Sequence, residues 1–226
     1  MRNNLTLHPI AHIHTDFATK FGIPRQPGLA EELKATIVFE KEYRKDGALK
    51  GMENFSHIWL IWGFNASFDH EWTPTVRPPR FGGTKRIGVF ASRSPFRPNP
   101  VGLSAVKIDA IRRTKEYGTV IDVIGADMMD NTPIYDIKPY IPYSDRLNAA
   151  PGFAEEPDVR KLHVQMSPVV GEKIPADKVA ALVEVLSMDP RPPYQNDPER
   201  TYGFVFAGME IKFKVKDDVL TVISAD

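Results

Sequence analysis

Short hydrophobic runs separated by turn-forming residues dominate the first two-thirds of the chain. Apolar and polar positions alternate there with a period of two, most clearly from Leu103 to Ile111, which is typical of a β-strand with one buried face. No long stretch of helical period interrupts these runs. The pattern predicts strands at 5–14, 34–39, 56–65, 86–91, 103–111 and 119–124. We expect them to close, or nearly close, into a β-barrel, because closure removes exposed strand edges.

The last third of the chain has a different pattern. Residues 147–158 are rich in Asn, Ala, Pro, Gly and acidic residues, which is typical of a linker. Apolar residues then recur at helical spacing over 176–188, and alternating runs follow. We therefore predict a mainly β protein, with an N-terminal β-barrel domain over 1–146, a linker over 147–158 and a small α+β C-terminal domain over 159–226.

Three of the predicted loops, at 21–28, 72–83 and 92–102, are rich in Pro, Gly and Arg. Proline fixes φ and reduces the conformations open to the unfolded chain, so such a loop holds its shape at a lower entropic cost. Stiff loops suit a binding site that must be formed before its ligand arrives.

Composition narrows the class of protein. The 226 residues are 42% hydrophobic and 26% charged, which is ordinary globular usage. The absence of cysteine excludes disulfides, iron–sulfur clusters and thiol nucleophiles. Neither a signal-peptide pattern nor an apolar run of membrane-span length is present, so we expect a cytoplasmic protein with no membrane partner.

Charge is balanced over the whole chain but unevenly distributed. Residues 77–113 contain nine basic residues and one acid, whereas residues 114–160 contain nine acids and four bases. Such a segment can present a local phosphate-attracting surface, because screening confines electrostatic fields to about 8 Å at physiological salt. Solvated arginines at strand ends are the alternative, and composition alone favours it.

Familiar nucleotide-binding and hydrolase motifs are absent from the sequence, including Gly-x-Gly-x-x-Gly, the P-loop and Gly-x-Ser-x-Gly. His8, His12 and His14 share one predicted strand, but a metal site would need a third ligand from elsewhere. We therefore expect no metal.

Two segments carry the densest polar chemistry. In residues 90–104, Arg93 and Arg97 lie on a loop with three prolines, and their planar forks match a carboxylate or a phosphate. In residues 126–140, Asp127 and Asp130 flank two methionines. An Asp/Asn turn with methionines filling a core is an alternative for the second segment. If the two segments face each other, they form one polar site.

Several long motifs occur in a fixed order: Phe-Gly-Ile-Pro-Arg-Gln-Pro-Gly at 21–28, Pro-Thr-Val-Arg-Pro-Pro-Arg at 74–80, the run 92–104, Asp-Ile-Lys-Pro-Tyr at 136–140 and Asp-Pro-Arg-Pro at 189–192. With these motifs the chain resembles the TrmO (YaeB/TsaA-like) family. The resemblance implies a homodimeric β-barrel methyltransferase that depends on S-adenosylmethionine. The implied substrate is the threonylcarbamoyl-adenosine 3′ of the anticodon in tRNA, methylated on its exocyclic nitrogen.

The resemblance also implies cofactor contacts in four places: the loop 21–28 (the first loop), the end of the strand 56–65, the segment 90–104 (the arginine loop) and the residues around 127–130 (the acidic turn). The residues are Pro24, Arg25, Gln26, Asn65, Ala66, Arg93, Leu103, Asp127, Met128, Met129 and Asp130. At the strand end the family pattern leads us to expect a histidine where this chain has Asn65. Asparagine still donates and accepts hydrogen bonds, but it cannot titrate as a base.

Catalytic and RNA-binding roles are hypotheses built on that resemblance. We expect Asp130 or Tyr140 to accept the proton of the methylated nitrogen, and Arg97 and Asn99 to hold the threonyl carboxylate or its carbonyl. The tRNA phosphates and bases would meet Arg77, Arg80, Lys85, Arg86, Arg191 and Tyr194, with Arg200 extending the surface. A non-catalytic S-adenosylmethionine sensor and a plain RNA-binding barrel are the alternatives.

Overall fold

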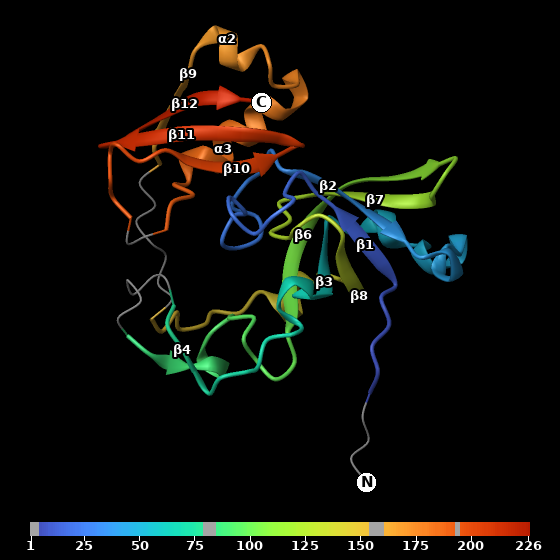
Figure 1. Ribbon diagram of the computed structural model, residues 1–226. Helices are drawn as coiled ribbons and strands as arrows, with labels where there is room; N and C mark the ends of the chain where they lie inside the picture. Colours follow the sequence, from blue (N-terminus) through green and yellow to red (C-terminus); the bar gives the residue numbers. More distant parts are fainter. Residues whose placement is uncertain (1–4, 79–84, 154–160, 193–194) are drawn as a thin grey trace.

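The computed structural model describes residues 5–78, 85–153, 161–192 and 195–226 (Figure 1). Six antiparallel strands pair in a closed ring, in the order β1-β2-β7-β6-β3-β8. The strands are β1 (Ala11–His14), β2 (Lys34–Phe39), β3 (His57–Gly63), β6 (Val101–Thr114), β7 (Gly118–Ile124) and β8 (Thr132–Pro139). The chain is mainly β, as the alternating pattern predicted.

Alternation along the strands fills the interior of the ring. Ile58, Leu60 and Trp62 of β3 point inward and belong to one hydrophobic core with side chains from the other five strands. In β6, Ser104 is 1% exposed, whereas its neighbour Leu103 is 56% exposed. Successive side chains of a strand face opposite sides, so Leu103 lies on the outer face of the ring and Ser104 lies inside.

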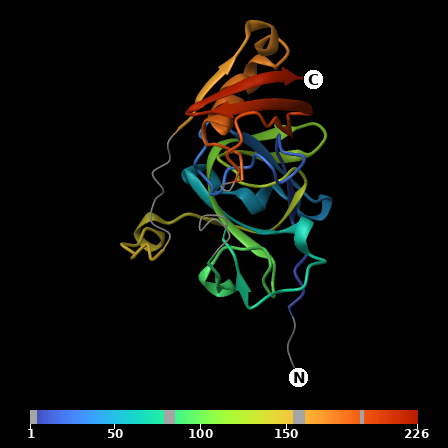
Figure 2. The same ribbon diagram turned by 60° about the vertical axis from the view of Figure 1, so that its left-hand side comes forward.

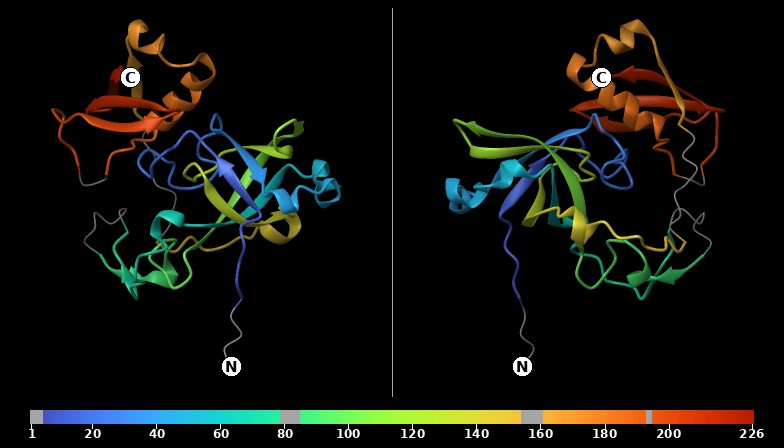
Figure 3. Two further views of the ribbon diagram at one scale, coloured as in Figure 1. Left: turned by 45° about the vertical axis from the view of Figure 1, so that its right-hand side comes forward. Right: turned by 180° about the vertical axis from the view of Figure 1, so that it is seen from behind.

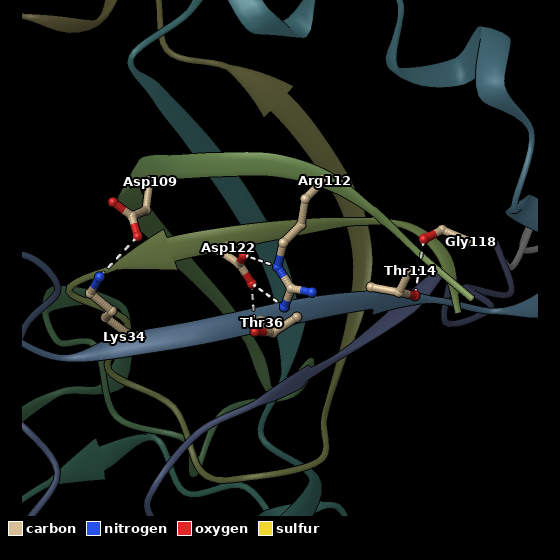
Figure 4. Close-up of polar contacts among 7 residues, drawn as sticks. All are labelled: Lys34, Thr36, Asp109, Arg112, Thr114, Gly118 and Asp122. Atoms are coloured by element: carbon tan, nitrogen blue, oxygen red, sulfur yellow. Dashed lines mark hydrogen bonds and ion pairs between the residues drawn. The ribbon is translucent and has the colours of Figure 1, made fainter. Parts of the chain in front are cut away.

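Charged side chains pair across the strands on the outer face (Figure 4). Asp122 of β7 accepts hydrogen bonds from Arg112 of β6 and, at 2.7 Å, from the hydroxyl of Thr36 of β2. Burial tends to raise the pKa of Asp122, but the bonds from Arg112 and Thr36 and the nearby positive charges outweigh it and lower this pKa below its ordinary value. The ion pair between Arg112 and Asp122 therefore stabilises the ring only while Asp122 is ionised.

Residues 64–100, which follow β3 and precede β6 along the chain, form a lobe outside the ring (the 64–100 lobe; Figure 1). Its described part contains the short helix η4 (Asn65–Ser67), the two-stranded sheet of β4 (Thr75–Val76) and β5 (Ile87–Gly88), and the short helix η6 (Val89–Ala91). Three further short helices lie between β2 and β3: η1 (Lys41–Tyr43), η2 (Asp46–Leu49) and η3 (Met52–Asn54). The strand predicted over 86–91 is wrong beyond Gly88, where the chain turns into η6.

A second sheet follows the ring, in the order β10-β11-β12-β9. Its strands are β9 (His163–Met166), β10 (Tyr202–Phe206), β11 (Met209–Lys216) and β12 (Val219–Ala225), and the helices of this region are α1 (Pro142–Asp145), α2 (Pro168–Gly171) and α3 (Ala176–Ser187). The helix predicted over 176–188 agrees with α3, which buries Leu182, Val185 and Leu186. No helix in the described ranges has both the length and the apolar character needed to cross a membrane.

The segment between β1 and β2 packs against the second sheet. Phe17 pairs with Phe206 of β10 and joins the hydrophobic core formed there with α3. The ammonium of Lys178 lies 2.6 Å from the carboxylate of Asp16. In Figures 1, 2 and 3 the C-terminal sheet lies above the ring and the 64–100 lobe lies below it. The first loop is thus held between the ring and the C-terminal sheet.

Candidate functional site

The first loop is docked against the segment that leads into the acidic turn. The amide of Gly28 donates a 2.9 Å hydrogen bond to the carbonyl of Gly125. Gly125 has φ +79°, and a Cβ at this position would lie 2.9 Å from the Cα of Gly28. Only glycine combines this backbone conformation with such a close approach. The pair therefore fixes the loop beside Asp127.

The arginine loop reaches the same place from another part of the chain. The guanidinium of Arg93 donates to the side-chain oxygen of Gln26, and the side-chain Nε2 of Gln26 donates to the backbone carbonyl of Arg25 at 2.6 Å. Pro24, just before them, is buried, whereas Arg25 and Gln26 are exposed. Two loops that are far apart in sequence thus meet through one charge-assisted hydrogen bond.

Two consecutive hydrogen bonds (the Trp62–Ser104–Asp127 relay) hold Asp127 inside the ring. The indole of Trp62 donates to Ser104 at 3.0 Å, and the hydroxyl of Ser104 donates to Asp127 at 2.7 Å. Burial raises the pKa of Asp127, while the Ser104 hydrogen bond and the positive charge of Arg93 oppose that rise. Asp127 therefore lies within the electrostatic reach of Arg93, and both predicted polar segments contribute to one cluster with Gln26.

Other predicted residues lie in η4 and on the arginine loop. Asn65 and Ala66 lie in η4 and are exposed, and the preceding amide of Phe64 donates to the carbonyl of Pro100 at 2.9 Å, which ties the end of β3 to the arginine loop. Arg97 donates to the carbonyl of Ser92 at 3.2 Å and so braces its own loop. Asn99 is exposed on the same loop, and its backbone carbonyl accepts from the backbone amide of Val101 at 2.8 Å.

Asp130 does not share the partners of Asp127. Its carboxylate accepts from the amide of Thr15 at 3.1 Å and lies 3.2 Å from His14 Nδ1. It lines a cavity of about 520 Å³ that Lys178 also lines. The acidic turn therefore directs its two carboxylates to different neighbours.

The two methionines of the acidic turn differ in exposure. Met128 is 1% exposed and packs in the core of the ring, whereas Met129 is half-buried. The Met128 side chain fits the alternative, a methionine that fills the core, and the cofactor contact predicted for this residue stays a prediction. Among the described residues no three acidic, histidine or cysteine side chains converge on a point where they could bind a metal.

Tyr140 and Leu103 lie on the outer face of the ring. The ring of Tyr140 packs against Trp59 at 5.6 Å between centroids. Trp59 alternates with the inward-facing Trp62 along β3, and Leu103 alternates with the inward-facing Ser104 along β6. The side chains of Tyr140 and Leu103 are therefore separated from the Ser104–Asp127 pair by the sheet.

The predicted RNA-binding residues have different environments. Arg77, Lys85 and Arg86 are exposed on the 64–100 lobe, and Arg86 donates to the hydroxyl of Thr75 at 2.8 Å. Arg200, exposed in the C-terminal region, places its guanidinium 5.5 Å from the ring centre of Tyr202.

Arg191 is a correction to the predicted RNA surface. It is 9% exposed, and it donates two 2.8 Å hydrogen bonds to the carboxylate of Asp189, so its guanidinium is a buried structural group. Arg80 and Tyr194 lie outside the described residues.

Sequence reasoning missed the groups that hold Asp127 in place. Ser104 was present in the alternating run, on the face opposite Leu103, and an inward-facing serine in a strand of the ring could have indicated a polar partner inside. Trp62 and Gly125 carried no such signal, because their roles depend on pairing with distant residues.

The fold and the cluster define a class of protein: a closed antiparallel ring in which a basic loop and an acidic turn meet beside the first loop. Residues 12–146 match the model of the tRNA-methyltransferase O N-terminal domain, and residues 160–226 match that of the TrmO C-terminal domain. The chain belongs to the TrmO family, as the sequence motifs predicted.

Individual relatives agree with this assignment. A protein of Escherichia coli K12 named tRNA (adenine(37)-N6)-methyltransferase is 35% identical over 217 residues, which cover 92% of each chain. A protein of the same name from Eikenella corrodens is 40% identical over 164 residues, covering 72% of this chain and 92% of the relative. The crystal structure of TrmO from Pseudomonas aeruginosa superimposes with a TM-score of 0.79 at 28% identity and covers 99% of both chains.

Proposed function

We propose that this chain is an S-adenosylmethionine-dependent methyltransferase that acts on the exocyclic nitrogen of threonylcarbamoyl-adenosine, 3′ of the anticodon in tRNA. The names of its Escherichia coli and Eikenella corrodens relatives support the reaction. The observation that carries the proposal is that the first loop joins the other two segments: Gln26 accepts from Arg93, and Gly28 bonds to Gly125, two residues before Asp127. In this proposal 1–146 is the cofactor-binding β-barrel domain, 147–158 the linker and 159–226 the C-terminal domain.

The chemistry of these side chains fits the cofactor. S-adenosylmethionine carries a carboxylate, an ammonium and a sulfonium close together, and it supplies an electrophilic methyl group when bound. Arg93 offers guanidinium donors for a carboxylate, and Asp127 offers a carboxylate for cationic groups. Backbone and side-chain groups of the first loop and of η4 would complete the site: Pro24, Arg25, Gln26, Asn65 and Ala66.

Proton removal from the substrate nitrogen is assigned to Asp127. A nitrogen conjugated with a purine and a carbonyl is a poor nucleophile, so it must be aligned with the methyl carbon and lose its proton. Asp130 and Tyr140, the acceptors expected from the sequence, are engaged with other partners. Burial raises the pKa of Asp127, which makes its carboxylate a stronger base than a solvated one. Arg97 and Asn99 remain the proposed partners of the threonyl carboxylate or its carbonyl.

The tRNA is proposed to approach over the 64–100 lobe. Arg77, Lys85 and Arg86 are exposed there, on the same lobe as Arg93 and Arg97 of the arginine loop. Phosphate contacts release counterions, so affinity for tRNA should fall steeply as salt increases. A tRNA substrate also supports a cytoplasmic location.

The proposed homodimer is assigned to the outer face of β3 and β6. Leu103 is 56% exposed there and pairs in register with Ile61, while Trp59 pairs with Ala105. Exposed apolar groups that neighbour one another are typical of an interface between subunits. Replacing Leu103 with aspartate should convert a dimer to monomers in sedimentation experiments; an unchanged mass would remove this face from the proposal.

Transfer of a labelled methyl group from S-adenosylmethionine tests the reaction. We expect label in tRNA that carries threonylcarbamoyl-adenosine and none in the unmodified transcript. An S-adenosylmethionine sensor would bind the cofactor in calorimetry and label neither RNA, and an RNA-binding barrel would bind no cofactor. In the Asp127→Asn variant, tRNA binding should persist while the methylation rate at saturating S-adenosylmethionine falls at least a hundredfold, in keeping with the usual contribution of a general base. Equal rates in the two proteins would contradict the role of Asp127.

A further inference from the structure

Four large aromatic side chains are exposed in the described part of the 64–100 lobe: Phe68, which packs over Gly63 at the end of β3, and the three considered next, Trp72, Phe90 and Phe96. Phe90 is 74% exposed, Trp72 is 50% exposed and Phe96 is 39% exposed. Side chains of this size usually bury most of their surface, and an exposed group of them marks a binding surface. The three rings are not part of the proposed cofactor cluster, which is formed by Gln26, Arg93 and Asp127.

Backbone hydrogen bonds bring the three aromatic residues to one short segment. The amide of Thr73 donates to the carbonyl of Phe96 at 3.4 Å, so Trp72 lies beside Phe96. The amide of Val89 donates to the carbonyl of Pro74 at 3.0 Å, which brings the neighbouring Phe90 to the same segment. The ring of Phe96 is supported from its edge by His70, at 5.4 Å between centroids.

The surroundings of these rings are basic. The described residues of the 64–100 lobe include five arginines and lysines, namely Arg77, Lys85, Arg86, Arg93 and Arg97, and two acids, namely Asp69 and Glu71. Phe90 and Phe96 also flank Arg93, which belongs to the cofactor cluster. A polyanion that stacks on the rings would therefore reach the reaction site without leaving the lobe.

We infer that Trp72, Phe90 and Phe96 form a platform on which unpaired bases of the tRNA anticodon loop stack. Aromatic rings bind bases of any sequence through their faces, but they cannot reach bases that are stacked within a duplex. The platform would thus select a loop over a stem and hold bases that neighbour the methylated one. This inference rests on the proposed tRNA substrate and adds the groups that recognise the loop.

A second copy of the chain is the other occupant to consider for this face. The central parts of interfaces between subunits are depleted of charged residues, whereas here the aromatic residues lie among five basic and two acidic side chains. Basic side chains interleaved with aromatic rings are typical of single-stranded nucleic-acid binding. The charge favours RNA.

The test compares binding of an anticodon stem-loop hairpin and of the same stem as a blunt duplex. In the triple variant Trp72→Ala, Phe90→Ala, Phe96→Ala, hairpin affinity should fall by about fivefold or more per base that stacks in the wild type. Affinity for the duplex should stay within about twofold, since phosphate contacts supply it. Tyr143→Ala is the matched control, because Tyr143 is a 91% exposed aromatic residue outside the lobe.

Tryptophan fluorescence gives a readout that loss of structure would not imitate. The chain has three tryptophans, and of these Trp62 is 6% exposed and Trp59 is half-buried with its indole bonded to Asp145. The hairpin should quench the emission of the wild type, and Trp72→Phe should abolish that quenching while S-adenosylmethionine affinity stays unchanged in calorimetry. The single variant Phe90→Ala, which removes the most exposed ring, should also weaken hairpin binding.

Three results would overturn the platform: equal hairpin affinity of the wild type and the triple variant, equal loss on hairpin and duplex, or a change of sedimentation mass in the triple variant. The last result would identify the face as an interface between copies. The methyl-transfer assay separates this inference from the proposed function. A wild type that methylates tRNA while the triple variant binds hairpin equally well refutes only the platform. A wild type that binds the hairpin through the rings but transfers no methyl group refutes only the reaction.

Discussion

The contact between Gly125 and Gly28 allows a sharp test of how the first loop is positioned. Both glycines have positive φ, +79° and +74°, so an alanine at either place meets the same kind of backbone strain. They differ in space. A Cβ on Gly125 would lie 2.9 Å from the Cα of Gly28 and 3.0 Å from its amide nitrogen, whereas no described atom lies within 4 Å of a Cβ on Gly28. Gly28→Ala is therefore a matched control for Gly125→Ala.

The expected magnitudes follow from this difference. A left-handed backbone costs a non-glycine residue about 1–2 kcal/mol, and this is the whole expected loss for Gly28→Ala. Gly125→Ala must also displace the Gly28 backbone and its hydrogen bond, which adds about 1 kcal/mol. Its loss should total about 2–3 kcal/mol. Displacement of Gly28 moves Gln26 away from Arg93, so affinity for S-adenosylmethionine should fall by about tenfold in Gly125→Ala alone.

Urea denaturation and calorimetry measure the two effects separately. We expect Gly28→Ala to unfold at slightly lower urea with nearly unchanged cofactor affinity, and Gly125→Ala to lose both stability and affinity. If both variants lose cofactor affinity equally, backbone strain alone explains the result. The close approach would then have no part in positioning Gln26.

Three further predictions concern single groups. Arg191→Ala should lower the free energy of unfolding by about 2–4 kcal/mol in urea denaturation and leave tRNA affinity unchanged; weaker tRNA binding without lower stability would restore its role at the RNA surface. Ser104→Ala removes the donor to Asp127 and should raise the pKa of that carboxyl further, so the acid limb of the rate–pH profile should move to higher pH; an unmoved limb would contradict the relay. Because the folded pKa of Asp122 is lowered, its stabilisation is complete above the ordinary carboxyl value of 3.8 and is lost as pH falls below it. The stability deficit of Arg112→Gln should therefore be present at neutral pH and vanish in acid; a constant deficit would show that Arg112 acts through packing.

Local pattern predicted most of the strands, and the exceptions have physical causes. Alternation at 119–124 and 34–39 corresponds to strands because both segments have one face in the core of the ring. β8, at Thr132–Pro139, escaped prediction because it contains two prolines and follows a turn rich in Asp and Asn, features that favour loops. Its pairing with both β1 and β3 closes the ring, and that pairing is a property of the whole sheet.

The site was predictable as far as residue chemistry determines it. Paired arginines and an acidic turn indicated a polar site, and the structure brings Arg93 and Asp127 into electrostatic reach of each other. The sequence could not show that Asp127 and Asp130 have different surroundings. The two residues are three positions apart on an irregular turn, and the backbone path of this turn directs Asp127 to Ser104 and Asp130 to Thr15. Arg191 had the same motif chemistry as the exposed arginines, but Asp189 two positions away binds it first.

Placement of the first loop links the C-terminal sheet to the candidate cofactor site. The segment between β1 and β2 carries Gln26, yet it is anchored outside the ring through the Lys178–Asp16 ion pair and the Phe17–Phe206 contact. Neither ring of this contact is more than 1% exposed, so the anchor includes buried apolar area as well as charge. Loosening it raises the entropy of the loop that must meet Arg93. We therefore expect the C-terminal region to contribute to cofactor affinity through the loop it holds, without supplying a side chain to the cluster of Gln26, Arg93 and Asp127.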